Sequence, residues 1–141
     1  MLGSSRFRHA IASTIARYLL GAIFLVFGLN GFLHFIPMPL PPGVAGQFFM
    51  ALGVSHYFAV VFLLEFVAAL LLLAGRYVPL ALTIIAPVVV NILCYHAFMA
   101  PSGLPMAVIL SFLWLLAVIN VRSAFAGLLQ KSTRNIVNET F

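Results

Sequence analysis

Acidic residues are almost absent from this chain: only two of its 141 residues are Asp or Glu, against seven Lys or Arg. Charged residues make up 6% of the sequence and hydrophobic residues 65%. A chain with so few polar residues cannot cover a soluble core, so the composition excludes a soluble globular protein. The length allows about four spans of roughly 20 residues each. We therefore expect an all-α membrane protein, a four-transmembrane-helix bundle whose surroundings are the lipid bilayer.

Cysteine is the second scarce residue, because Cys94 is the only one. A single cysteine excludes an intramolecular disulfide and a CxxC thiol relay within the chain. The sequence has no close Cys/His cluster of the kind that binds zinc, so we expect no metal site. It also has no nucleotide or phosphate motif, and its basic residues indicate membrane topology and not nucleic-acid binding.

The most informative single residue is Glu65, which interrupts an otherwise apolar run from Tyr57 to Arg76. An ionisable group at mid-membrane costs at least about 2.5 kcal/mol and persists only where it faces protein, a partner or a wet cavity. Ala68 and Ala69 follow it at i+3 and i+4, so a second helix can approach on the same face. We expect Glu65 in the bundle interior, as a hydrogen-bonded structural group or as a functional one.

Hydrophobic runs, prolines and glycines divide the chain into elements. We expect a short interfacial helix in 1–16, spans at about 18–35, 57–74, 79–98 and 105–125, and a short apolar helix at 44–52 that lies at the interface. Pro87 predicts a kink in the third span, between residues 79–86 and 88–98. The expected domains are a cytoplasmic basic segment 1–16, a four-helix membrane domain 17–126 and a cytoplasmic tail 127–141.

The Lys and Arg positions predict the orientation. With four spans, both termini and the turn at Arg76 lie on one side of the membrane, and all seven Lys and Arg residues fall on that side. Positive charge in short loops marks the cytoplasmic side. We therefore expect a multi-pass protein of the cell (inner) membrane with both termini in the cytoplasm.

Polar side chains from three spans fall at one depth in this arrangement. Counting about 1.5 Å per residue from the cytoplasmic cations places Asn30, Glu65 and Asn91 at a similar level. His34, Tyr95 and His96 come next toward the outer face. The pattern predicts a polar pocket that is open toward the outer face, in which Glu65 hydrogen-bonds to Asn30 or Asn91, directly or through one water.

Several chemistries suit such a pocket. His34 and His96 could ligate a b-type haem between helices, but their spacing is not diagnostic, so we do not favour haem. Glu65 with a histidine could move protons or hydrogen-bond a quinone head group among the many Phe side chains. A purely structural polar core is the alternative, since a lone histidine is more often an interfacial side chain than a ligand. We expect Trp114, in the middle of the fourth span, to serve in packing.

The order of short motifs along the chain carries a family resemblance. The motifs are Gly28-Leu29-Asn30-Gly31-Phe32 before Phe35-Ile36-Pro37-Met38-Pro39, Glu65 before Leu70 to Gly75, Pro79-Leu80-Ala81-Leu82, Ala86-Pro87, Asn91-Ile92 and His96. Over about residues 17–125 this order resembles the DoxX-like family of small four-helix membrane proteins. The chain departs from the family pattern at Ala68 and Ala69, where glycine is usual, and at His56-Tyr57, where a Gly-Tyr pair is usual.

The resemblance implies a four-helix transmembrane bundle and a link to redox chemistry. The family's name comes from a subunit associated with thiosulfate:quinone oxidoreduction, and other members are linked to thiol and oxidative-stress complexes. Because this chain has no thiol pair or cofactor motif, we expect a membrane subunit or anchor of a thiol, sulfur or quinone-linked assembly, with membrane or soluble redox proteins as partners. A self-sufficient enzyme is less favoured. The rival hypotheses are a structural or assembly protein and a small-solute or proton pathway.

Overall fold

The structure is a computed structural model that describes the backbone of residues 2–129 and the side chains of residues 10–126. Within that range the secondary structure is helical, without strands: α1 (Leu2–Leu33), α2 (Gly43–Val54), α3 (Tyr57–Ala74), α4 (Val78–Phe98), η1 (Pro101–Gly103), α5 (Leu104–Asn120) and η2 (Arg122–Leu129), where η marks a 3₁₀ helix. Four stretches are long and apolar enough to cross a membrane: Ala10–Leu33, Tyr57–Ala74, Val78–Phe98 and Pro101–Asn120. The predicted all-α four-helix membrane bundle is confirmed.

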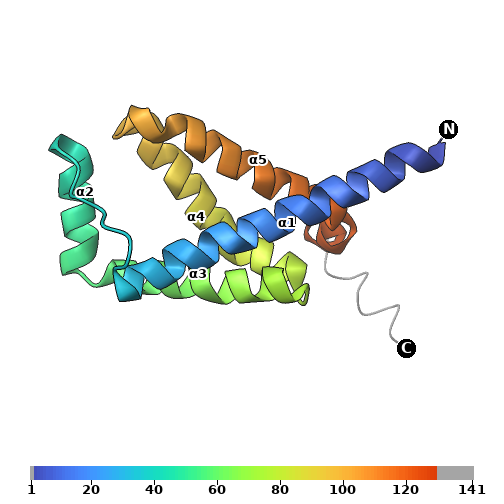
Figure 1. Cartoon of the computed structure of the whole chain (residues 1–141), viewed down its shortest axis with the longest axis horizontal. Helices are drawn as coiled ribbons and strands as arrows, with labels where there is room; N and C mark the ends of the chain where they lie inside the picture. The colour runs from blue at the N-terminus through green and yellow to red at the C-terminus, as the bar shows by residue number, and fades with distance from the viewer. Residues whose placement is uncertain (1, 130–141) are drawn as a thin grey trace.

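The four long helices form a closed ring. Helix α1 packs against α3 and α5, and α4 packs against the same two helices from the other side (Figure 1). Large apolar side chains fill the middle: Leu20, Phe24, Leu72, Leu82 and Ile85 are fully buried. Ala68 and Ala69 are also fully buried, which agrees with their predicted role on the face of α3 that a neighbouring helix approaches.

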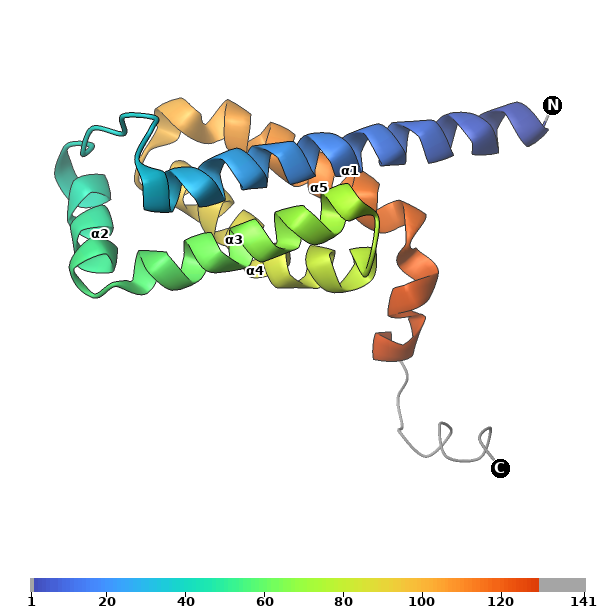
Figure 2. The ribbon, with the colours of Figure 1, turned by 60° about the horizontal axis from the view of Figure 1, so that its bottom comes forward.

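Helix α2 lies across one end of the ring, with its axis roughly perpendicular to the long helices in both ribbon views (Figures 1 and 2). The proline-rich stretch from Pro37 to Pro42 is extended because proline cannot continue a helix, and it leads the chain from α1 to α2. The expected short helix at 44–52 is confirmed and begins one residue earlier and ends two residues later. With 12 residues it is too short to span a bilayer.

The limits of two helices differ from those expected. Helix α1 is continuous from Leu2 to Leu33, so the separate interfacial helix expected in 1–16 is wrong. No proline interrupts this stretch, and its N-terminal part continues past the other helices (Figure 2). Helix α4 runs from Val78 to Phe98 with Pro87 inside it, and the kink expected at Pro87 stays a prediction. Helix α5 ends at Asn120, five residues before the expected end at Phe125.

Candidate functional site

Glu65 lies inside the bundle, at the contact between α3 and α1. Its side chain is 5% exposed. On α1 the facing residue is Gly28, where a Cβ atom would lie 2.9 Å from the backbone nitrogen of Phe66 and 3.3 Å from Cβ of Glu65. The absence of a side chain at Gly28 is what lets the two helices approach so closely. The expected interior position of Glu65 is confirmed.

The Glu65 carboxyl group is not fully satisfied by the protein. Its Oε2 atom is buried and has no hydrogen-bond partner among the described residues. Buried polar atoms in proteins are nearly always paired, so an unpaired carboxyl oxygen inside a membrane bundle needs an explanation. It is the feature on which a functional interpretation of this protein depends.

Asn30 is the second buried polar residue of this region, with an exposed fraction of 1%. Its Nδ2 donates to the carbonyl oxygen of Ile36 at 3.1 Å, and its Oδ1 accepts from the backbone nitrogen of Ile36 at 2.5 Å. Both ends of the amide therefore stabilise the turn that leaves α1. No direct hydrogen bond joins Asn30 to Glu65, and the contacts of the Asn30 amide are with Ile36 instead.

Asn91 lies on the exposed side of α4. The buried face of α4 is formed by Ala81, Leu82, Ile85, Val88 and Val89. Asn91 lies off this face, and it also makes no direct hydrogen bond to Glu65. The sequence placed the two residues at one depth but could not fix the rotation of α4 about its axis.

The remaining candidate residues lie in separate turns. His34 is exposed at the end of α1, with Nδ1 3.2 Å from the carbonyl oxygen of Phe32. His96 is half-buried at the end of α4, with Nδ1 3.0 Å from the carbonyl oxygen of Ala100 and its ring against Gly103. Within residues 10–126 no three His, Cys, Asp or Glu side chains are grouped so as to hold a metal ion.

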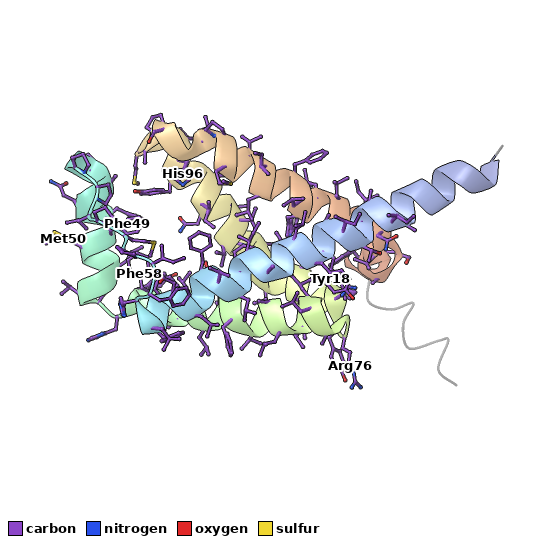
Figure 3. The ribbon with its side chains drawn as sticks, viewed as in Figure 1. Tyr18, Phe49, Met50, Phe58, Arg76 and His96 are labelled. Atoms are coloured by element: carbon purple, nitrogen blue, oxygen red, sulfur yellow. The ribbon has the colours of Figure 1, made fainter. Side chains whose placement is uncertain are left out.

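Aromatic rings from α1, α2, α3 and α4 form a continuous row of contacts. We call this row the aromatic cluster; its members are Phe32, Phe48, Phe49, Phe58, Phe62 and Tyr95. The shortest distances between ring centroids in the cluster are 5.1 Å, from Phe49 to Tyr95, and 5.2 Å, from Phe49 to Phe58. The side chain of Phe58 lies between α2 and the bundle (Figure 3). Phe62 precedes Glu65 by three residues and therefore lies on the same face of α3. The sequence analysis named only Tyr95 of this cluster as a candidate site residue, although the i, i+4 spacing of Phe58 and Phe62 indicates a shared face.

Two further polar contacts join the helices near the cationic end. Arg17 donates from Nη1 to the carbonyl oxygen of Leu72, and its guanidinium lies 4.2 Å from the centre of the Tyr18 ring. Trp114 is half-buried, packs against the core as expected, and donates from Nε1 to the carbonyl oxygen of Leu82 at 3.0 Å. The sequence did not predict the hydrogen bond from Trp114 to Leu82.

Two shallow apolar hollows open on the surface away from Glu65. One, of about 230 Å³, is lined by Ala10, Ile11, Thr14 and Ile15. The other, of about 180 Å³, is lined by Leu82, Thr83, Ala86, Trp114, Val118 and Phe125. Neither includes a candidate site residue.

Comparison of the chain with protein-family models, with curated proteins and with solved structures gives no significant match.

Proposed function

We propose that this chain is an integral membrane subunit of a quinone-linked redox assembly, in which the carboxyl group of Glu65 binds the quinone head group. The observation that carries the proposal is the buried Oε2 atom of Glu65 without a hydrogen-bond partner in the described residues. An unsatisfied buried polar atom costs about 1 to 3 kcal/mol. A group kept at that cost in an apolar helix is expected to serve a function.

The chemistry of Glu65 suits both redox forms of a quinone. When protonated, its carboxyl group can donate a hydrogen bond to a quinone carbonyl oxygen. When ionised, it can accept one from the hydroxyl of a quinol. The aromatic cluster on the same side of α3 offers apolar rings against which a flat head group can stack.

The resemblance of the motif order to that of the DoxX-like family supports the redox part of the proposal. A chain with one cysteine cannot carry out a dithiol reaction alone, so the electrons would pass to a partner protein.

We further propose the orientation that the cations predict, with both termini in the cytoplasm and α2 at the outer side.

Quinone binding by the purified protein tests this proposal. The chain is reconstituted in lipid nanodiscs, and binding of a tritiated short-chain ubiquinone is measured for the unmodified protein, for Glu65→Gln and for Thr83→Val. Thr83 is the matched control, because its exposed hydroxyl bonds only to the carbonyl oxygen of Pro79 in its own helix. We expect saturable binding by the unmodified protein and Thr83→Val, and its loss in Glu65→Gln with unchanged helix content.

A structural role for Glu65 is the second candidate, favoured by the close packing of Gly28 against its Cβ atom. In that case Glu65→Gln keeps the stability of the bundle, and the unmodified protein binds no quinone. Absence of saturable binding to the unmodified protein therefore overturns the quinone proposal.

A further inference from the structure

The buried core of the bundle ends at the level of Glu65. Toward the turn that joins α3 to α4, α3 buries Ala68, Ala69 and Leu72, whereas none of its residues before Glu65 is buried. Helix α4 runs in the opposite direction and shows the same limit, because none of its residues after Val89 is buried. Glu65 therefore lies at the boundary between a fully buried half of the bundle and a less buried half, which is the half nearer to α2.

The least buried path from the Glu65 carboxyl group runs along α3 toward α2. On the α1 side the helices touch at Gly28, where an added Cβ atom would lie 2.9 Å from the nitrogen of Phe66. On the side of the α3–α4 turn, the fully buried core fills the bundle. In the other direction lie Phe62 and Phe58, three and seven residues before Glu65 and thus on its face of α3, and both are half-buried.

Phe49, on α2, stands at the far end of this path. The centre of its ring lies 5.2 Å from that of Phe58 on α3 and 5.1 Å from that of Tyr95 on α4. Phe58 in turn stacks on Phe62, with 5.4 Å between the ring centres and 18° between the ring planes. Phe62 is packed against the backbone of α1 at Gly31, because a Cβ atom added there would lie within its ring. Phe49 is the residue of α2 whose ring contacts both α3 and α4.

Helix α2 is joined to the chain on both sides by residues with a left-handed backbone. Gly43, at its start, has a φ of 68°, and His56, directly before α3, has a φ of 58°. A Cβ atom added at Gly43 would meet nothing within 4 Å, so this junction is not packed against other atoms. Hinges of moving lids are a few terminal residues of this kind, which absorb the change in backbone angles. The two junctions therefore suit a helix that swings as one body.

We infer that Phe49 is a gate on the path from the end covered by α2 to Glu65, and that α2 is the lid that carries it. In this structure the Glu65 side chain is 5% exposed, so a ligand reaches the carboxyl group only when the Phe49 ring leaves its place between Phe58 and Tyr95. The inference rests on the proposed function, because a gate serves a purpose only if Glu65 binds a ligand. It adds the route by which that ligand enters and leaves.

Reaction of Glu65 with dicyclohexylcarbodiimide, a lipid-soluble reagent for carboxyl groups, tests the gate. The full chain is reconstituted in lipid nanodiscs, and the labelling rate of the peptide that contains Glu65 is measured by mass spectrometry. The unmodified protein is compared with Phe49→Ala and Phe49→Leu, and Glu65→Gln gives the background signal. The measurement uses no quinone, so its failure is distinct from a failure of quinone binding.

Two control variants separate the opening of a gate from a general loosening of the bundle. Phe112→Ala removes a ring of the same size from α5, where the side chain is 58% exposed. Trp114→Phe removes the hydrogen bond to the carbonyl oxygen of Leu82, which joins α5 to α4 in the half of the bundle away from α2. Circular dichroism of each variant checks that the helix content is unchanged.

We expect the labelling rate to rise about tenfold or more in Phe49→Ala, because the two ring contacts that favour the closed lid are lost. Phe49→Leu should show a smaller rise, and both controls should react like the unmodified protein. Equal rates in Phe49→Ala and the unmodified protein overturn the inference. An equal rise in Trp114→Phe also overturns it, because loosening of the bundle then exposes the carboxyl group.

Phe49→Leu decides the question if Phe49→Ala does not fold. If the Phe49 variants react faster while the unmodified protein binds no quinone, the gate stands and only the quinone proposal fails.

Discussion

The guanidinium group of Arg17, on α1, donates a hydrogen bond to the carbonyl oxygen of Leu72, in the last turn of α3. The last carbonyl groups of a helix have no partner within the helix and favour a cation nearby. Gly75 ends α3 with a φ of 67°, and a Cβ atom there would lie 3.1 Å from the Arg17 guanidinium. Arg17 thus ties the first spanning helix to the end of the second.

Replacing Arg17 by Met should therefore lower the stability of the bundle. The change removes a charge-assisted hydrogen bond to a carbonyl group, which is worth about 1.5 to 3 kcal/mol. Thermal unfolding in mild detergent, followed by circular dichroism, should show a lower melting temperature. Arg76→Met is the control, because Arg76 is an exposed cation at the same end. Equal melting temperatures for the two variants would contradict this role of Arg17.

Gly28→Ala should also destabilise the protein, because its new methyl group would be 2.9 Å from the Phe66 nitrogen and 3.1 Å from the Phe62 carbonyl oxygen. Both are backbone atoms and cannot move aside without separating α1 from α3. Overpacking of this kind typically costs about 1 to 3 kcal/mol. Gly53→Ala in α2 is the control, since no atom lies within 4 Å of its added methyl group. Unfolding by sodium dodecyl sulfate should distinguish the two, and a Gly28→Ala variant as stable as Gly53→Ala would refute the close contact.

Asn30→Ala should loosen the turn between α1 and α2. The change leaves the backbone nitrogen and carbonyl oxygen of Ile36 without their partner, at a cost of about 1 to 3 kcal/mol. Hydrogen exchange measured by mass spectrometry should become faster in peptides that contain Ile36. Asn91→Ala, on the exposed side of α4, should leave the exchange of the same peptides unchanged. The prediction fails if exchange at Ile36 is the same in both variants.

A reporter fused to the C-terminus should establish the orientation. All seven Lys and Arg residues fall on the side that holds both termini, which predicts a cytoplasmic C-terminus. Alkaline phosphatase, active only outside the cytoplasm, should therefore be inactive in this fusion, and green fluorescent protein should fluoresce. An active phosphatase fusion would contradict the predicted orientation, because the C-terminus would then lie outside the cytoplasm.

The sequence predicted best those elements whose ends are marked by Pro or Gly. Helix α3 has the expected limits, Tyr57 and Ala74, because Gly75 ends it in the left-handed conformation that glycine favours. The interior position of Glu65 was also predictable, since the cost of a carboxyl group in lipid leaves few alternatives.

The contacts of the polar residues were not predictable, because they depend on helix rotation and on backbone geometry in the turns. Depth along a span can be counted from the sequence, but the exposed position of Asn91 depends on which face of α4 meets α3 and α5. The pairing of Asn30 with Ile36 depends on the path of the chain after Leu33, where His34 has a φ of 52° that few non-glycine residues adopt. A hydropathy pattern contains neither kind of information.

The closed ring of spanning helices has a consequence for biosynthesis. Because α1 packs against both α3 and α5, its second neighbour is the last of the four spanning helices to leave the ribosome. Insertion of α3 can pair it with α1 early, but one side of α1 remains in lipid until α5 arrives. Assembly of the bundle thus finishes after translation of the membrane domain is nearly complete, and a chain truncated before Leu104 would enter the membrane with an open ring.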